Sequence, residues 1–570
     1  MNSRTIPYIG AFRRGLAGLT IVLGAVLAIG WWVDRGRMEP IPEAGDLKLD
    51  CVSYAPFRRP GETPFDPLAF VSPQRIEQDL RILRARTDCV RTYAVHQGLE
   101  AVPEVARRLG MRVKLGAWIG RDAAANAIEL DRAIALTHSY RDVVDLLIVG
   151  NEVLLRGELT APALSRLLAR ARRESAVPVS YADVWEFWLR NDWLRGQVDL
   201  VTVHILPYWE DDPVAIGQAV EHVVSIAAKV TQHFAGTPVL VGETGWPGAG
   251  RQRAGAVPGR VNQARFAREF VARASRESLS YNFIEGFDQP WKRRLEGAMG
   301  GRWGLFDRDG VPHFAWSGAL QEDPRWWYGP LAAALLGLLG CVAWVRRRRE
   351  AFAGAVLALA WTATGALAVA HWQYMHAWCR TPLDWVVSGL AALFALLCAL
   401  LGADRLSVVT GGSRQSVPTA RARDAAASYR TVPPAEAASR EAEPGIARAL
   451  RGRAMPGRAF ALCRAATLFA AGVIAIALVF DPRYRGFPWA LFAAPALVFL
   501  ALRIAGERLH VDAREERLLA GVIALCAPVI AWNEGAHNAQ AIGFALLLLL
   551  LAGASAWPYR VSRPAGKRGG

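Results

Sequence analysis

The chain has 570 residues, of which 52% are hydrophobic and 21% are charged. This composition excludes an intrinsically disordered chain, a collagen-like fibre and a small disulfide-stapled module. The net charge of +16 would ordinarily suggest a nucleic-acid partner. However, residues 41–325 hold 36 basic and 36 acidic side chains, so the whole basic excess lies outside this segment. That remainder also contains the long apolar runs, and we therefore expect no nucleic-acid partner.

The first apolar run, residues 15–33, is long enough to span a bilayer as a helix. Three arginines precede it, and no small-residue cleavage pattern follows it, so an uncleaved anchor is favoured over a signal peptide. Apolar runs return after residue 325, at about 327–345, 351–371, 384–402, 460–480, 487–504, 517–533 and 540–558. The sequence therefore predicts an all-α transmembrane region of about eight helices.

The breaks between these runs alternate between arginine-rich and arginine-poor. The positive-inside bias places the arginine-rich breaks and both termini in the cytoplasm. The multi-pass protein would then lie in a bacterial inner membrane, with residues 41–325 in the periplasm. The predicted domain map is a cytoplasmic N-terminus (1–14), an anchor (15–33), the periplasmic domain (41–325), three helices (326–403), a disordered arginine-rich cytoplasmic loop (404–459), four helices (460–558) and a cytoplasmic tail (559–570).

Two of the seven cysteines, Cys51 and Cys89, lie in the external domain. An oxidising compartment permits a disulfide between them. Each opens a predicted strand, however, and neighbouring parallel strands are an awkward geometry for a bridge, so free thiols are favoured. No Cys/His spacing resembles a metal site, and we expect neither a metal nor another cofactor.

Residues 45–325 alternate short β-branched runs with amphipathic helical stretches, a pattern typical of βα units around a parallel sheet. Helices are expected at 74–86, 99–109, 126–139, 161–174, 214–234 and 262–277. Eight units in this length predict a (β/α)8 TIM barrel. The expected strands are Leu49–Tyr54, Cys89–Val95, Arg112–Trp118, Leu146–Val149, Val177–Tyr181, Leu200–Ile205, Val239–Val241 and Tyr281–Phe287.

Aromatic, amide and charged side chains gather where these strands end, which is where the chemistry of a TIM barrel lies. Rings that stack on sugars, interleaved with groups that bind hydroxyls, indicate a carbohydrate cleft. For any single ring, capping of the barrel is an equally good explanation. The candidate substrate-binding residues are Tyr54, Tyr93, Asn151, Tyr181, Trp185, His204, Tyr208, Trp209, Trp246, Glu285, Asp288, Gln289, Trp291 and Lys292.

Two carboxylates stand out among these strand ends. Glu152 follows the fourth strand in IVGNEVL, and Glu243 ends the seventh in VLVGETGWP. Glycosidic cleavage needs one carboxylic acid to protonate the leaving oxygen and a second carboxylate to attack the anomeric carbon or activate water. Strands four and seven lie across a barrel mouth from one another, so both side chains can reach one bond. A lone glutamate there would be more typical of an ion pair.

The motifs VGNEVL, GETGWP, EGFDQPWK and WGLFDRDG together resemble glycoside hydrolase family 17, the β-1,3-glucanase family, over nearly all of residues 47–315. The resemblance implies a (β/α)8 barrel that retains anomeric configuration, with Glu152 as general acid/base and Glu243 as nucleophile. It also implies a Glu and a Lys three residues apart after strand eight. Here Lys292 matches, but Gln289 replaces the Glu, which puts the charge of this subsite in doubt.

The membrane setting favours glucan remodelling over degradation of food. The chain resembles membrane-bound bacterial members of the family, which elongate or branch periplasmic or cyclic β-1,3/β-1,6-glucans. We therefore expect a β-glucan glucosyltransferase, with a glucan substrate, the lipid bilayer and a membrane glucan synthase as candidate partners. An endo-β-1,3-glucanase is the alternative. A glucan-binding receptor or transporter component is the second alternative, since His371, Asp384, Asn533, Glu534 and His537 lie near the predicted outer face.

Overall fold

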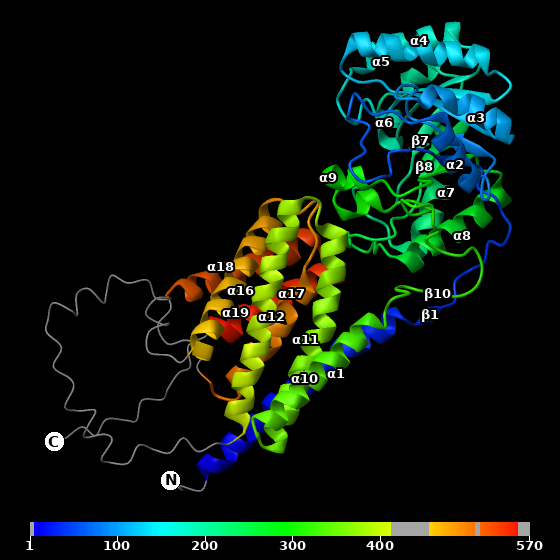
Figure 1. Cartoon of the computed structure of the whole chain (residues 1–570). Helices are drawn as coiled ribbons and strands as arrows, with labels where there is room; N and C mark the ends of the chain where they lie inside the picture. The colour runs from blue at the N-terminus through cyan, green and yellow to red at the C-terminus, as the bar shows by residue number, and fades with distance from the viewer. Residues whose placement is uncertain (1–4, 412–454, 508–513, 557–570) are drawn as a thin grey trace, which may run out of the picture. The chain divides into compact units, whose positions relative to one another are not determined.

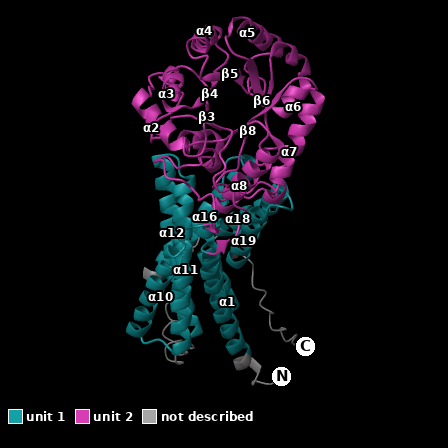
Figure 2. Ribbon diagram, turned by 90° about the vertical axis from the view of Figure 1, so that its right-hand side faces the viewer, with its two compact units in different colours: residues 1–36, 323–570 teal, residues 37–322 magenta. Residues whose placement is uncertain are grey.

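The computed structural model describes residues 5–411, 455–507 and 514–556. It divides the chain into two compact units, residues 37–322 and residues 1–36 with 323–570 (Figures 1 and 2). Residues 37–322 form the β-rich unit, and the other unit comprises the apolar helices. Each unit is described by itself below.

The β-rich unit is built on a closed barrel of eight strands, in which every neighbouring pair is parallel (Figure 2). The strands follow one another around the barrel in chain order, as in a TIM barrel. All eight strands expected from the sequence are confirmed. They are β2 (Cys51–Ser53), β3 (Cys89–Arg91), β4 (Arg112–Ala117), β5 (Val144–Asn151), β6 (Val179–Val184), β7 (Val201–His204), β8 (Val239–Thr244) and β9 (Tyr281–Phe283).

Helices surround this barrel at each of the six expected stretches. They are α2 (Pro73–Leu83), α3 (Val102–Leu109), α4 (Ala123–Ser139), α5 (Ala161–Glu174), α7 (Ile216–His233) and α8 (Arg260–Glu277). The side chains of Ser72, Asp122 and Thr160 cap α2, α4 and α5 by accepting backbone N–H bonds, which explains where these helices begin.

Several short elements were not expected, because they are too short to show a periodic pattern. These are α6 (Trp185–Arg190), α9 (Arg293–Glu296), a two-stranded antiparallel pair of β1 (Met38–Glu39) with β10 (Leu320–Gln321), and the 3₁₀ turns η2 (Asp192–Gln197), η3 (Pro290–Lys292) and η4 (Ala298–Gly301). The 3₁₀ turn η1 (Leu99–Ala101) begins the helical stretch expected at 99–109.

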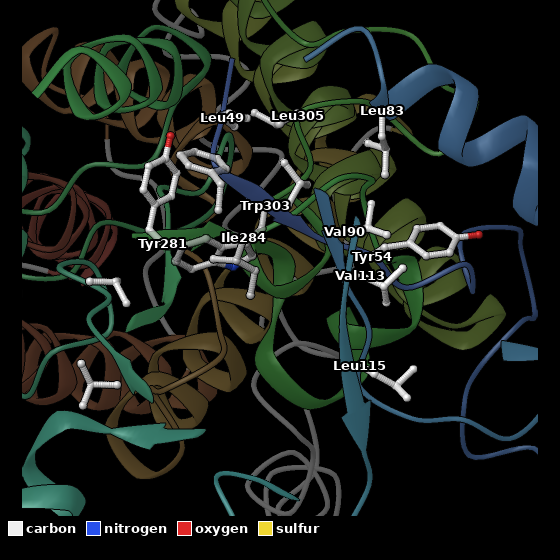
Figure 3. Close-up of a cluster of buried hydrophobic side chains, with 14 of the residues drawn as sticks. Leu49, Tyr54, Leu83, Val90, Val113, Leu115, Tyr281, Ile284, Trp303 and Leu305 are labelled. Carbon is white, nitrogen blue, oxygen red and sulfur yellow. The ribbon is translucent and has the colours of Figure 1, made fainter. Parts of the chain in front are cut away.

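Apolar side chains of the strands form the core of this unit (Figure 3). Val113 and Leu115 occupy alternate positions of β4 and are fully buried, as the two-residue period of a strand requires. Leu83 of α2 and Val90 of β3 belong to the same cluster, which joins helix to sheet. This packing fixes the strand ends that carry the candidate site.

The structure joins Cys51 and Cys89 by a disulfide, and this corrects the expectation of free thiols. Val52 pairs with Val90 in the sheet, so the two cysteines one residue earlier lie directly side by side. Their Cα atoms are 4.5 Å apart, which falls within the range that a disulfide spans. A bridge between neighbouring parallel strands can form when the two cysteines occupy paired positions in the sheet, as they do here.

The second unit contains a helix at each of the eight expected apolar runs. Five of its described helices are long and apolar enough to cross a membrane, namely α1, α10, α11, α12 and α16, whereas α17 and α19 are apolar but shorter. Membrane crossing stays a prediction. The helices are α1 (Thr5–Arg35), α10 (Tyr328–Arg346), α11 (Ala351–Trp378), α12 (Pro382–Thr410), α16 (Met455–Phe480), α17 (Trp489–Ile504), α18 (Arg514–Glu534) and α19 (Ala539–Ala556).

Two of the expected loop boundaries differ from the structure. Helix α12 continues to Thr410 and α16 begins at Met455, so both ends of the expected loop 404–459 are helical. The remainder of that loop, residues 412–454, and the expected tail lie outside the described residues. Likewise α1 begins at Thr5, inside the segment expected to precede the anchor.

Candidate active site

Glu152 and Glu243 lie at the carboxyl ends of β5 and β8. Each of these strands carries one extra residue just before its glutamate. Ile148 and Asn151 of β5 pair with Ser180 and Ala182 of β6, and Val241 and Glu243 of β8 pair with Val203 and His204 of β7. Such bulges change the direction of the side chains that follow, and they are common beside active sites.

The backbone at Glu152 is left-handed, with φ +54°, which is uncommon for a residue with a side chain. Gly150 before it has φ +85°, and a Cβ there would lie 2.7 Å from Cγ2 of Val153. The buried Asp183 carboxylate stabilises this turn, because it accepts hydrogen bonds from the backbone N–H groups of Leu154 and Leu155 at 3.3 and 3.4 Å. The glycine of the turn predicted from the sequence is therefore required sterically, because a side chain at position 150 would clash with Val153.

His204, at the end of β7, lies between the two carboxylates. Its Nδ1 is 2.9 Å from Glu152 Oε1, and its Nε2 is 3.7 Å from Glu243 Oε1. One oxygen of each carboxylate and one ring nitrogen all lie within 4.8 Å of one another. Retaining glycosidases place their carboxyl groups about 5–5.5 Å apart, and inverting enzymes about 6.5–9.5 Å apart. Oxygens of Glu152 and Glu243 within 4.8 Å of one another fit the shorter, retaining spacing better than the inverting one.

Two further side chains hold the Glu243 carboxylate. Arg91 donates to Oε1 at 2.7 Å, and the Tyr93 hydroxyl donates to the same oxygen at 2.8 Å. Burial by itself would raise the pKa of Glu243, but the charged and polar side chains around it, Arg91, Tyr93 and Lys292 among them, outweigh burial, so the pKa lies below its usual value. The lowered pKa favours an ionised Glu243, which is the state that the expected role of nucleophile requires.

Arg91 also connects this carboxylate to the neighbouring strand end. Its guanidinium donates to Oδ1 of Asn151, and Arg91 itself is 1% exposed. Sequence reasoning missed Arg91 and Asp183. A charged residue inside the apolar strand CVRTY, two positions before Tyr93 and so on the same face, was the signal available for Arg91.

A second group of charges adjoins Glu243. Lys292 donates to both oxygens of Glu285, at 2.8 and 3.0 Å. Burial raises the pKa of Glu285 to about 7, although Lys292 acts in the opposite direction. Burial alone would lower the pKa of Lys292, but Glu285 and Glu296 raise it above its usual value, so the ammonium stays charged.

This geometry resolves the doubt raised by the departure at Gln289. Gln289 is fully buried, and its amide donates to the Ala55 carbonyl at 2.6 Å, so it does not face Lys292 as a partner. The carboxylate that pairs with Lys292 is Glu285, which lies at the end of β9 rather than three residues before the lysine.

Four of the expected sugar-binding rings are enclosed in protein. Tyr54 donates to Asp79, Tyr181 to Asp183, Tyr208 to the Arg251 carbonyl and Trp246 to the Val257 carbonyl, and each is at most 1% exposed. Here the structure differs from the expectation, because a ring at a strand end can turn inward and cap the barrel. Asp288 is also buried, and it pairs with Arg302 and His313.

The remaining candidate rings are partly exposed, namely Tyr93, Trp185, Trp209 and Trp291. Trp291 donates to Oε1 of Gln289 at 2.9 Å and meets the exposed ring of Phe65 edge to face at 5.5 Å. Trp209 lies under the guanidinium of Arg253 at 5.1 Å. These rings are the candidates that can still contact a sugar.

Glu152, His204 and Glu243 also form a group of donors close enough together to hold a metal ion. The guanidinium of Arg91 bonds the Glu243 oxygen and would repel a cation there. We therefore assign no metal to this site.

Comparison with known proteins agrees with this geometry. Residues 51–304 match the family model of the BtgE/BtgC glycoside hydrolase domain. A glucan 1,3-beta-glucosidase of Arthroderma benhamiae is 28% identical over 257 residues, which is 42% of this chain and 82% of that protein. A probable beta-glucosidase btgE of Aspergillus fumigatus is 28% identical over 227 residues, 38% of this chain but only 39% of that protein.

Among solved structures, the glycoside hydrolase family 17 beta-1,3-glucanosyltransferase of Rhizomucor miehei matches with 23% identity and a TM-score of 0.42, covering 48% of this chain and 99% of that chain. The residues that match the family model lie in the barrel unit. The barrel is therefore an enzyme domain of the glycoside hydrolase class. More particularly, residues 51–304 are similar to the BtgE/BtgC glycoside hydrolase domain.

Proposed function

We propose that this chain is a membrane-bound retaining β-glucan glucosyltransferase that acts on β-1,3-glucan. The observation that carries the proposal is the pair of carboxylates, Glu152 and Glu243, whose oxygens lie within 4.8 Å at the mouth of the barrel. The names of the relatives, a glucan 1,3-beta-glucosidase and a beta-1,3-glucanosyltransferase, support the choice of substrate class.

In the first step, an oxygen of Glu243 attacks the anomeric carbon of the bound glucan. The glycosidic bond breaks, and the leaving oxygen takes the proton of Glu152, so a covalent glucosyl-enzyme and a shortened glucan result. Arg91 and Tyr93 keep Glu243 ionised before the attack. Asn151 accepts from Arg91 through Oδ1, and its amide NH₂ is the group that we assign to the sugar 2-hydroxyl.

In the second step, Glu152 takes a proton from an incoming hydroxyl, whose oxygen attacks the anomeric carbon and releases Glu243. If the hydroxyl belongs to another glucan, the product is elongated or branched, and if it belongs to water, the enzyme is an endo-β-1,3-glucanase. The partly exposed rings of Trp209 and Trp291 support transfer, because they can bind an acceptor and exclude water.

Product analysis distinguishes transfer from hydrolysis. The full chain in detergent is incubated with laminari-oligosaccharides, and the products are separated by length and their linkages are assigned by NMR. We expect products longer than the substrate, with β-1,3 or β-1,6 linkages. Products that are only shorter than the substrate would make the chain a hydrolase.

We further propose that the barrel lies in the periplasm of a bacterial inner membrane, where it would elongate or branch glucan made at that membrane. The Cys51–Cys89 disulfide supports this placement, because such bonds persist in oxidising compartments. The arginine-rich breaks between apolar helices support cytoplasmic termini.

A further inference from the structure

His204 is buried between the two proposed catalytic groups, and it is 1% exposed. Nδ1 forms a 2.9 Å hydrogen bond with Oε1 of Glu152. Nε2 lies 3.7 Å from Oε1 of Glu243 and makes no hydrogen bond within the part of the chain that the structure describes. The imidazole therefore lies between the two carboxylates. Nδ1 is hydrogen-bonded to Glu152, whereas Nε2 faces Glu243 at a longer distance.

The space that the His204 ring occupies depends on the glycine at position 242 of the neighbouring strand β8. Gly242 is the extra residue of β8, and a Cβ there would lie 2.8 Å from Cδ2 of His204 and 2.6 Å from Cγ2 of Thr202. Any larger residue would displace the imidazole. The glycine before Glu243 thus serves the placement of His204 as well as the turn.

The charges around His204 limit where its proton can reside. Glu152 and Glu243 lie beside it, Asp183 lies within range of its charge, and Arg91 and Tyr93 donate to Oε1 of Glu243, the same oxygen that Nε2 faces. An ionised Glu243 attracts an N–H at Nε2. A neutral imidazole with its proton there presents a lone pair at Nδ1, and that lone pair requires a proton on the facing Glu152 oxygen.

We propose that His204 is a positioning residue that holds the acid proton on Glu152. The carboxyl O–H of Glu152 donates to Nδ1, while Nε2–H points toward the anionic Glu243. This assignment rests on the proposed function, because it concerns the acid and nucleophile of that reaction. It gives the two carboxylates opposite protonation states through one ring.

The same arrangement serves the second step. When the leaving oxygen takes the proton, Glu152 becomes a carboxylate that faces the Nδ1 lone pair. This carboxylate receives no hydrogen bond from Nδ1 and can accept the proton of the incoming hydroxyl. Once Glu152 has taken that proton, the hydrogen bond to Nδ1 forms again, so His204 neither gains nor loses a proton over the cycle.

The test compares two substrates with the full chain in detergent. Laminari-oligosaccharides need protonation of the leaving oxygen, whereas a dinitrophenyl β-laminaribioside does not. For His204→Ala we expect kcat/KM to fall about 100-fold on the oligosaccharide, a typical share of general acid catalysis, and less than about 10-fold on the aryl glycoside. The alkaline limb of the pH profile should move to lower pH, because the protonated form of Glu152 loses its acceptor.

His138→Ala is the control, since His138 lies on α4 and contacts only the carbonyl of Glu174 by hydrogen bond. His204→Asn, which fills more of the space, provides a second variant if the alanine variant does not fold. Equal losses on both substrates with an unmoved pH profile would overturn the proposal and leave His204 a packing residue. If the unaltered chain turned over neither substrate, the proposed function would fail instead.

Discussion

At the scale of single residues, the charge and orientation of each side chain in the site depend on the groups that it contacts. The sequence predicted both carboxylates, because each follows an apolar strand and a glycine-containing turn. It could not predict that Trp246 turns inward or that Glu285 pairs with Lys292, since these depend on loop packing over the barrel. Position at a strand end is visible in sequence, whereas the direction of a ring is set by tertiary contacts.

Substitution of the proposed acid gives the first prediction. Glu152→Gln should lower kcat/KM on laminari-oligosaccharides about 10²–10⁴-fold, because general acid catalysis contributes that much. Azide should restore turnover of an aryl β-laminaribioside, since it attacks the glucosyl-enzyme without needing a base. The product expected by NMR is the β-glycosyl azide. Failure of azide to restore turnover, or an α-glycosyl azide, would contradict this role.

Arg91 carries a prediction on pH dependence. Its guanidinium helps to lower the pKa of Glu243, and the nucleophile must be ionised, so activity should persist on the acid side. In Arg91→Met that pKa should rise, and the acid limb of kcat/KM should move to higher pH. Arg91→Lys, which keeps a charge, is the matched control and should move it less. An acid limb that is identical in all three proteins would contradict this assignment.

At the scale of elements, the apolar runs of the sequence predict that a strand is present, but they do not predict which of its residues pair with those of the neighbouring strand. The sequence predicted all eight strands of the barrel and six surrounding helices. It missed the extra residues in β5 and β8, because a bulge is defined by the partner strand. It also misjudged Cys51 and Cys89, because adjacent register is a property of the folded sheet.

The disulfide between β2 and β3 gives a prediction on stability. It closes a loop with a sequence separation of 38 residues, which constrains the unfolded chain. Serine at both positions should lower the free energy of unfolding by about 4 kcal/mol in the chain-entropy account. The measurement is denaturant unfolding of the full chain in detergent, followed by tryptophan fluorescence. Cys341→Ser is the control, because Cys341 is a free thiol. Equal midpoints in both variants would argue against a stabilising bridge.

At the scale of the whole molecule, the distribution of charge is the basis of the proposed topology. The barrel segment has balanced charge, whereas the basic excess lies among the apolar helices. Ser225 and Arg348 are both exposed, one on α7 of the barrel unit and one between α10 and α11. The proposed topology places them on opposite sides of a membrane.

Labelling of intact spheroplasts tests this placement. A membrane-impermeant maleimide should label Ser225→Cys and should leave Arg348→Cys unlabelled until the membrane is opened. The unaltered chain gives the background from its own free cysteines. The reverse pattern would place the barrel in the cytoplasm and would remove the argument for periplasmic glucan.

The central claim, a retaining reaction through Glu243, is tested most directly by trapping the covalent intermediate. The full chain is treated with a deoxyfluoro laminaribiosyl fluoride, digested with trypsin and analysed by mass spectrometry. Glu243 is the only carboxylate side chain in the tryptic peptide 230–251. We predict that this peptide alone gains the mass of the sugar, and that Glu243→Gln prevents it. Label on another peptide, or release of products with inverted configuration, would contradict the account.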